Sequence, residues 1–197
     1  MTVRVMLVAP ATTAAVREAR FGADEPLDEL GARAARAAAG DLPQVRQPLC
    51  GPSLRCRATA EALGLQAEPA DRLADWDMGR WRGRRLDEVS AGEPEAVAVW
   101  LSDPSAVPHG GESLTALCAR AGDWLRSLPD DAGRVLAVVE PAFARAVTVH
   151  ALGLPVEVFW RLDVAPLALT ELSGRAGRWN LRCGRPLAGE RTVPDRP

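Results

Sequence analysis

The feature that most constrains the fold of this chain is a set of short apolar runs, each stopped by a proline or a glycine. These runs span residues 3–8, 46–50 and 134–139. Runs of this kind are typical of strands buried inside a sheet. Apolar side chains recur at helical spacing over residues 26–39, 53–63, 113–128 and 141–152. This alternation predicts an α/β domain with a mostly parallel central sheet.

Two stretches depart from this alternation. Residues 68–108 show poor periodicity, and we interpret them as an insertion of short helices that lies over the sheet edge. Residues 166–172 and 178–182 look like a closing antiparallel pair of strands. The predicted caps are Asp24 for the first helix and Ser53 for the second, because short polar side chains accept hydrogen bonds from the first free N–H groups of a helix.

Length and composition favour one globular domain. The chain has 197 residues, of which 47% are hydrophobic, and its net charge is −2. We expect one domain over residues 1–185 and a loose tail over residues 186–197. All 24 basic residues are arginine, so Schiff-base and P-loop lysine chemistry is excluded. A sequence pI near 5.8 argues against a strongly basic nucleic-acid binder.

The sequence lacks the patterns that are typical of several other classes of protein. The four cysteines show no C-x-x-C spacing, which argues against a zinc knuckle or a thioredoxin motif. Residues 1–8 are too short for the apolar region of a signal peptide, and no apolar run approaches the roughly 20 residues of a membrane span. We expect a cytoplasmic protein with reduced thiols, no cofactor, no metal, and neither a membrane nor a nucleic-acid partner.

In parallel α/β sheets, ligands bind beyond the carboxyl ends of the strands. The residues to consider therefore follow the apolar runs, in the segments 9–13, 51–60 and 140–145. The polar segments 73–83 and 109–113 complete the set. Together these five segments resemble, in order and spacing, the histidine phosphatase superfamily, whose fold is phosphoglycerate-mutase-like. The resemblance covers roughly residues 3–185 and implies a three-layer α/β/α sandwich.

The resemblance fails at the residues that carry the chemistry of the family. The first family motif reads Leu-Val-Arg-His-Gly-Glu-Thr, and its histidine is the phosphorylated nucleophile. Here Ala9 stands at the arginine position and Pro10 at the histidine position. The second family histidine lies in a Ser-His-Gly-Gly context, which here reads Glu140-Pro141-Ala142-Phe143. This chain is therefore predicted to be a degenerate member that lacks both catalytic histidines.

Proline cannot replace either histidine, because it has neither a lone pair for attack nor a proton to give. Losing one nucleophile of a protease triad costs on the order of 10⁶ in rate. The two histidines of the chain do not restore the chemistry, since His150 lies nine residues beyond Pro141 and His109 lies on the insertion. Family-type phosphatase activity is predicted to be absent, with no catalytic residue assigned.

Several residues remain candidates for ligand binding: Thr12, Arg55, Asp75, Glu112, Ser113 and Glu140. The resemblance places Arg55 where the family holds the phosphoryl group, and Asp75 where it carries a general acid. The family's Gly-Gly-Glu-Ser turn is retained, with Ser113 as a predicted helix cap. Arg55 either contacts a ligand or pairs with Asp75 or Glu140.

Glu140 is unusual because a carboxylate at a strand end would repel phosphate and attract Arg55. It either neutralises the pocket internally or favours a cationic or metal-bearing ligand. A metal or acid–base pair formed by Asp75 and Glu140 is a sharper alternative. Two tryptophans of the insertion, Trp76 and Trp81, are candidate contacts for a ligand or partner, whereas Arg145 is interpreted as structural.

Two functions therefore compete. The first is a catalytically inactive protein with a partial anion or phosphoryl pocket, which acts in the binding of a small phosphorylated or anionic ligand or in assembly, with a homodimer as one form of assembly. The alternative is an enzyme with rebuilt hydrolase or phosphatase chemistry, in which Asp75, Glu140 or Thr12 replaces the histidines.

Overall fold

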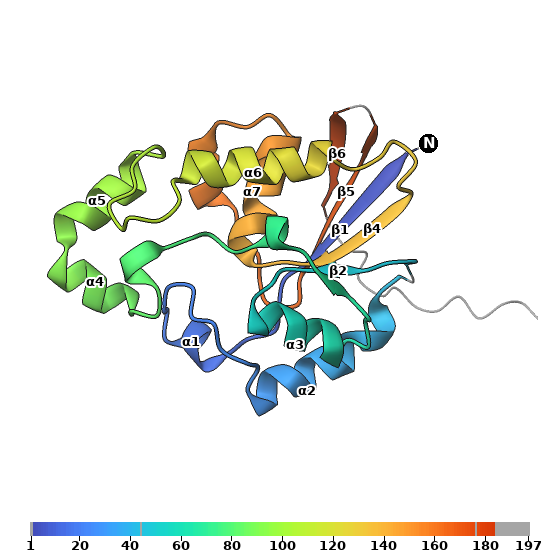
Figure 1. Cartoon of the computed structure of the whole chain (residues 1–197), viewed down its shortest axis with the longest axis horizontal. Helices are drawn as coiled ribbons and strands as arrows, with labels where there is room; N and C mark the ends of the chain where they lie inside the picture. The colour runs from blue at the N-terminus through green and yellow to red at the C-terminus, as the bar shows by residue number, and fades with distance from the viewer. Residues whose placement is uncertain (1, 44, 176, 184–197) are drawn as a thin grey trace, which may run out of the picture.

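The computed structural model describes residues 2–43, 45–175 and 177–183. The predicted tail over residues 186–197 lies outside this part of the chain. A six-stranded sheet runs through the molecule in the order β3-β2-β4-β1-β5-β6 (Figure 1). Its strands are β1 (Val3–Val8), β2 (Leu49–Cys50), β3 (Glu68–Pro69), β4 (Arg134–Val138), β5 (Leu169–Arg175) and β6 (Arg178–Arg182). The first four strands pair in parallel, and β5 and β6 extend the sheet antiparallel.

Helices cover both faces of the sheet, which confirms the three-layer sandwich. On one face lie α1 (Ala14–Arg17), α2 (Glu29–Ala38) and α3 (Leu54–Ala62), and on the other lie α6 (Leu114–Arg126) and α7 (Pro141–Ala151). Side chains alternate along β1, so Val5 and Leu7 join the core under α6 and α7. Met6 and Val8 face the opposite core, under α2 and α3. Burial on both faces explains why these runs are almost wholly apolar.

The strands β2, β3 and β5 differ from the predicted ones. The second apolar run forms a strand only at Leu49–Cys50, because these two residues alone pair with Ala137 and Val138 of β4. The two-residue strand β3 was not predicted, since Glu68 and Pro69 carry no strand pattern. The closing antiparallel pair is confirmed, with β5 shifted to Leu169–Arg175.

Short polar side chains cap the helices α2, α3 and α6, as predicted, but the residue that caps α2 is not the predicted one. Ser53 and Ser113 accept hydrogen bonds from Cys56 N and Ala116 N at the starts of α3 and α6. Asp24 does not cap α2: that helix begins later, and Asp28 accepts from Gly31 N instead. Asp24 accepts a hydrogen bond from Leu54 N, so it fastens the loop before α2 to the start of α3.

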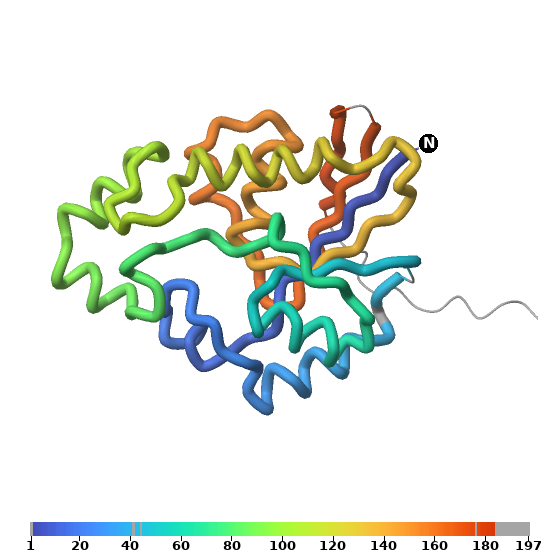
Figure 2. Tube along the Cα trace, in the orientation of Figure 1, coloured from blue at the N-terminus to red at the C-terminus, as the bar shows by residue number. Residues whose placement is uncertain are grey.

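The irregular segment 68–108 folds into short helices, as expected. It holds 3₁₀ turns at Asp71–Leu73 and Gly79–Trp81, then α4 (Leu86–Gly92) and α5 (Pro94–Ser102). Figure 2 shows this green part of the chain reaching out to the end of the molecule opposite β5 and β6. Further 3₁₀ turns lie at Ala39–Asp41 and Val156–Arg161. Within the described residues, no helix is both long and apolar enough to cross a membrane.

Candidate functional site

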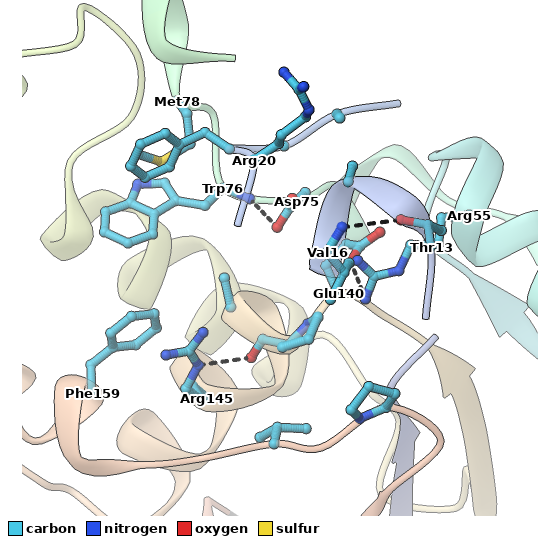
Figure 3. Close-up of a pocket in the computed structure, with 18 of the residues that line it drawn as sticks. Thr13, Val16, Arg20, Arg55, Asp75, Trp76, Met78, Glu140, Arg145 and Phe159 are labelled. Atoms are coloured by element: carbon cyan, nitrogen blue, oxygen red, sulfur yellow. Dashed lines mark hydrogen bonds and ion pairs between the residues drawn. The ribbon is translucent and has the colours of Figure 1, made fainter. Parts of the chain in front are cut away.

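A pocket of 320 Å³ opens beyond the carboxyl ends of the parallel strands. Its walls come from the loop before and after α1, the first turn of α3, the segment 75–78, the start of α7 and the stretch 159–166. Figure 3 shows the polar side chains of Arg55, Asp75 and Glu140 along one part of this pocket and aromatic rings along another. Three of the six candidate residues therefore meet at one site, as the rule for strand ends predicts.

Arg55 forms an ion pair with Glu140 rather than facing open space. The distance between Arg55 Nη2 and Glu140 Oε2 is 3.3 Å. Both residues are buried, with exposed fractions of 9% and 6%. The hydroxyl of Ser53 donates to Glu140 Oε1 over 2.9 Å, which fixes the carboxylate in the pocket. The charge that could hold a phosphoryl group is therefore already compensated by the protein.

Asp75 lies beside this pair, and the pKa of its carboxyl is raised. Burial, together with the negative charge of Glu140, raises the pKa of Asp75 from 3.8 to about 7. Its Oδ1 accepts a hydrogen bond of 2.7 Å from Trp76 N, which opposes the shift, as do the charges of Arg55 and Arg82. Asp75 therefore exchanges its proton near neutral pH.

The three positions at which the resemblance predicts catalytic residues, Ala9, Pro10 and Pro141, carry no reactive side chain. Ala9 and Pro10 are buried at the end of β1. Pro141 lines the pocket as the first residue of α7, a position that suits proline because its missing N–H would be unpaired there in any case. The cyclic side chain of Pro141 therefore occupies the pocket wall where the resemblance places an imidazole.

Neither histidine lies among the residues that line the pocket. The ring of His109 packs against Trp76 and Trp81, its Nδ1 accepts from Gly111 N over 3.1 Å, and burial lowers its pKa. His150 is near the end of α7, where its Nε2 lies 2.9 Å from Nη1 of Arg126. Both positions agree with the prediction that neither imidazole restores the family chemistry.

The structure does not place Thr12, Glu112 and Ser113 among the lining residues. Thr13 lines the pocket instead of its neighbour, and its hydroxyl accepts from Val16 N at the start of α1. Glu112 forms an ion pair of 2.8 Å with Arg120. That guanidinium also donates to the carbonyls of Ala74 and Asp75. Glu112 therefore acts behind the pocket, where it holds the loop that carries Asp75.

Sequence reasoning missed two cationic side chains of the pocket, Arg20 and Arg145. Arg145, which we interpreted as structural, lines it, with its guanidinium 4.7 Å from the centre of the Phe159 ring. Its Nε donates to the Pro141 carbonyl in its own helix. The signal was present in the spacing, because residues 141 and 145 are one helical turn apart and share a face of α7.

Sequence reasoning also missed most of an aromatic wall, which consists of the lining residues Phe21, Trp76, Trp100, Phe159 and Trp160. Their rings contact one another, with centroids between 4.7 Å, for Trp100–Trp160, and 5.8 Å, for Trp76–Trp160, in the contacting pairs. Trp76 was a predicted contact, whereas Trp81 is fully buried behind the wall. Phe21 and Phe159 are far from Trp76 in sequence, so only the fold brings them together.

The model of the histidine phosphatase superfamily (branch 1) matches residues 10–184 of the chain. The chain belongs to the histidine phosphatase superfamily. The match covers β2 to β6, the helices on both faces of the sheet and every residue that lines the pocket, whereas β1 precedes it.

Curated relatives in this superfamily are phosphatases. Glucosyl-3-phosphoglycerate phosphatase of Mycobacterium tuberculosis is 31% identical over 169 residues, which cover 77% of this chain and 75% of the relative. Phosphoserine phosphatase 1 of Hydrogenobacter thermophilus is 29% identical over 146 residues, 70% of this chain and 69% of the relative. A solved structure of the mycobacterial glucosyl-3-phosphoglycerate phosphatase complexed with VO3 has a TM-score of 0.79 and 28% identity, and covers 91% of this chain and 96% of its own.

The described residues offer little to a metal ion. Among residues 2–43, 45–175 and 177–183, no group of three or more histidine, cysteine, aspartate or glutamate side chains could hold one. The pocket therefore offers three kinds of interaction to a ligand: the aromatic wall, the titrating carboxyl of Asp75, and the guanidinium of Arg145.

Proposed function

We propose that this protein is a non-catalytic member of the histidine phosphatase superfamily that binds a small anionic molecule in its pocket. The observation that carries the proposal is the ion pair between Arg55 and Glu140. In an active phosphatase, the resemblance implies that this arginine holds the phosphoryl group. Here a buried carboxylate of the chain occupies that arginine, beside a proline where a histidine would act.

The rest of the pocket supports binding rather than turnover. No residue at the two family histidine positions can form a phosphohistidine, and both histidines of the chain lie elsewhere. The cavity nevertheless persists at 320 Å³, with polar groups beside an aromatic wall. A mostly apolar cavity with a few placed polar groups is the usual form of a small-molecule site.

Two assays test the proposal together. Hydrolysis of p-nitrophenyl phosphate by the purified chain is expected to stay at the background rate between pH 5 and 8. Calorimetric titration with phosphate, sulfate and small organic acids is expected to detect binding of at least one anion. Turnover comparable with that of an active superfamily phosphatase would refute the proposal. The absence of heat with every anion would refute the proposed anion binding and would leave a role in assembly as the remaining function.

The pocket also supports a second candidate, an enzyme with rebuilt chemistry. Asp75 has a pKa of about 7 and so can donate a proton near neutral pH, while Glu140 and Arg55 form the adjacent ion pair. A pair of carboxyls in different environments is the arrangement that acid–base hydrolysis uses. If the chain hydrolyses any ester in a substrate screen, Asp75→Asn and Glu140→Gln must each abolish that turnover for this candidate to hold.

A further inference from the structure

Two of the three arginines that line the pocket form ion pairs with carboxylates of the chain. Arg20 lines the pocket but pairs with Glu18 over 2.7 Å. Arg55 pairs with Glu140 over 3.3 Å. Arg145 forms no ion pair with any residue that the structure describes, and its one protein acceptor is the Pro141 carbonyl. Arg145 is therefore the lining arginine whose N–H groups remain open to a ligand, although the charges of Asp163 and Asp75 act on it from further away.

The guanidinium of Arg145 is also held in place. Its Cζ atom lies over the Phe159 ring, 4.7 Å from the ring centre, which is within the range of a cation–π contact. Figure 3 shows Arg145 reaching toward the centre of the pocket, between Phe159 and the loop of Asp75. A guanidinium fixed by a ring and by one carbonyl keeps several N–H donors free, in the fork geometry that matches a carboxylate.

The negative charges of the pocket decide which anion suits this guanidinium. Phosphate monoesters carry close to two negative charges at pH 7. Such a group would bring two negative charges to one lining arginine that has no carboxylate in contact, and would lie near Asp75, so one of its charges would stay uncompensated. A carboxylate carries one charge, which Arg145 alone neutralises.

The aromatic wall defines the rest of the ligand. Phe21 and Trp160 line the pocket with partly exposed rings, whereas Trp76 and Trp100 are buried with exposed fractions of 5% and 8% and Phe159 is wholly buried. A bound molecule therefore meets mainly the rings of Phe21 and Trp160. Planar apolar groups pack on such surfaces by offset or edge-to-face contacts. The volume of 320 Å³ suits a molecule of one or two rings.

We infer that the ligand is an aromatic monocarboxylate, whose carboxylate binds Arg145 and whose ring packs against the aromatic wall. This inference rests on the proposed binding function and names the chemical class of the ligand. It places the anion on α7, away from the ion pair of Arg55 and Glu140. It also gives a reason for the cluster of aromatic side chains around a pocket that has lost its catalytic groups.

Calorimetric titration with four matched probes tests the inference: 3-phenylpropionate, phenyl phosphate, phenethylamine and acetate. We expect 3-phenylpropionate to bind most tightly, because it alone offers both one negative charge and a ring. Phenethylamine keeps the ring and reverses the charge, while acetate keeps the charge and lacks the ring. Tighter binding of phenyl phosphate would overturn the inference and leave the proposed anion-binding function standing. Binding of none of the four would also overturn it, whereas phosphatase turnover would overturn the proposed function itself.

Variants of Arg145 and Arg20 test where the carboxylate of the bound probe lies. Arg145→Gln is expected to weaken 3-phenylpropionate binding by about 10-fold or more, the range for a hydrogen bond to a charged group. Arg20→Gln is the matched control, since it removes a lining arginine that is already paired, and it should change the affinity by no more than about twofold. Arg145→Lys retains the charge and should retain part of the affinity. Equal losses in Arg20→Gln and Arg145→Gln, at matched melting temperatures, would contradict a specific contact with Arg145.

Discussion

At the scale of single residues, Asp75 makes the stability of the protein depend on pH. Its pKa is about 7 in the folded chain and 3.8 as an ordinary carboxyl. Between these values the folded state binds more protons than the unfolded state, so stability falls as pH rises from about 4 to 7. Burial raises this pKa most and the charge of Glu140 raises it further, whereas the hydrogen bond from Trp76 N and the charges of Arg55 and Arg82 lower it.

We expect Asp75→Asn to raise the free energy of unfolding relative to the parent chain at pH 8, by on the order of a few kcal/mol. The gain should shrink as pH falls and should vanish near pH 4, where the parent carboxyl is neutral in both states. Urea unfolding at a series of pH values measures it. Asp75→Ala removes the same proton and must show the same dependence on pH, whatever its absolute stability. A difference from the parent that stays constant between pH 4 and 8 would contradict the raised pKa.

Glu140 provides a second prediction at this scale, because it compensates a buried guanidinium. Glu140→Gln keeps the shape of the side chain and leaves the charge of Arg55 without its partner, which should cost about 3 kcal/mol of stability. Sulfate should then restore part of the loss by binding the freed arginine. The measurement is the melting temperature with sodium sulfate and with sodium chloride at equal ionic strength.

The matched control is Glu112→Gln, which breaks the ion pair with Arg120 behind the pocket. Sulfate should stabilise Glu140→Gln more than it stabilises either this control or the parent chain. An equal response of all three proteins would show that Arg55 does not become available to an anion. That result would also weaken the proposal that Glu140 pairs with the arginine that would otherwise hold a phosphoryl group.

At the scale of elements, α4 and α5 are joined to the 3₁₀ turn at Gly79–Trp81 through one carboxylate. Glu93 pairs with Arg84 over 2.7 Å, pairs with Arg80, and accepts from Trp81 Nε1 over 3.1 Å. These contacts lower the pKa of Glu93 to about 2. Its contribution is therefore present above the ordinary value of 4.5 and is lost as pH falls toward 2.

We expect Glu93→Gln to loosen this segment without unfolding the sheet. Amide hydrogen exchange should become faster in α4 and α5 and remain unchanged in β1 and β4, because the sheet core does not depend on this carboxylate. Glu95→Gln, two residues further along in the first turn of α5, is the control and should leave exchange unchanged. Uniformly faster exchange over the whole chain would contradict a local role for Glu93.

The same scale shows how far the sequence predicts this molecule. The strands β1 and β4 and the helices α6 and α7 were predicted closely, because burial on both faces of the sheet and one-sided burial of a helix leave clear periodic patterns. β2 and β3 were poorly predicted, since two paired residues leave no pattern. The pairing of Arg55 was left open between Asp75 and Glu140, and no local signal could decide it, because 85 residues separate Arg55 from Glu140 in the chain.

At the scale of the whole molecule, the chain keeps the fold of the superfamily, whereas we propose that it lacks the chemistry of the family. The differences that remove the predicted chemistry are confined to a few positions at the strand ends, namely Ala9, Pro10, Glu140 and Pro141. Because the backbone around them is kept, a small number of substitutions should rebuild a phosphatase.

The combined variant Ala9→Arg, Pro10→His, Glu140→Ser and Pro141→His is expected to hydrolyse p-nitrophenyl phosphate at least about 10²-fold faster than the parent chain, the lower end of what one positioned acid–base group contributes. Its Glu140→Ser step frees Arg55, and Asp75 remains beside the pocket as a proton donor. The same variant with Pro10 retained lacks the nucleophile and should stay at background. If the folded combined variant is no faster than this control, the pocket has lost the geometry of the family as well as its side chains. The ion pair of Arg55 and Glu140 would then accompany a reshaped site and would not by itself account for the proposed loss of activity.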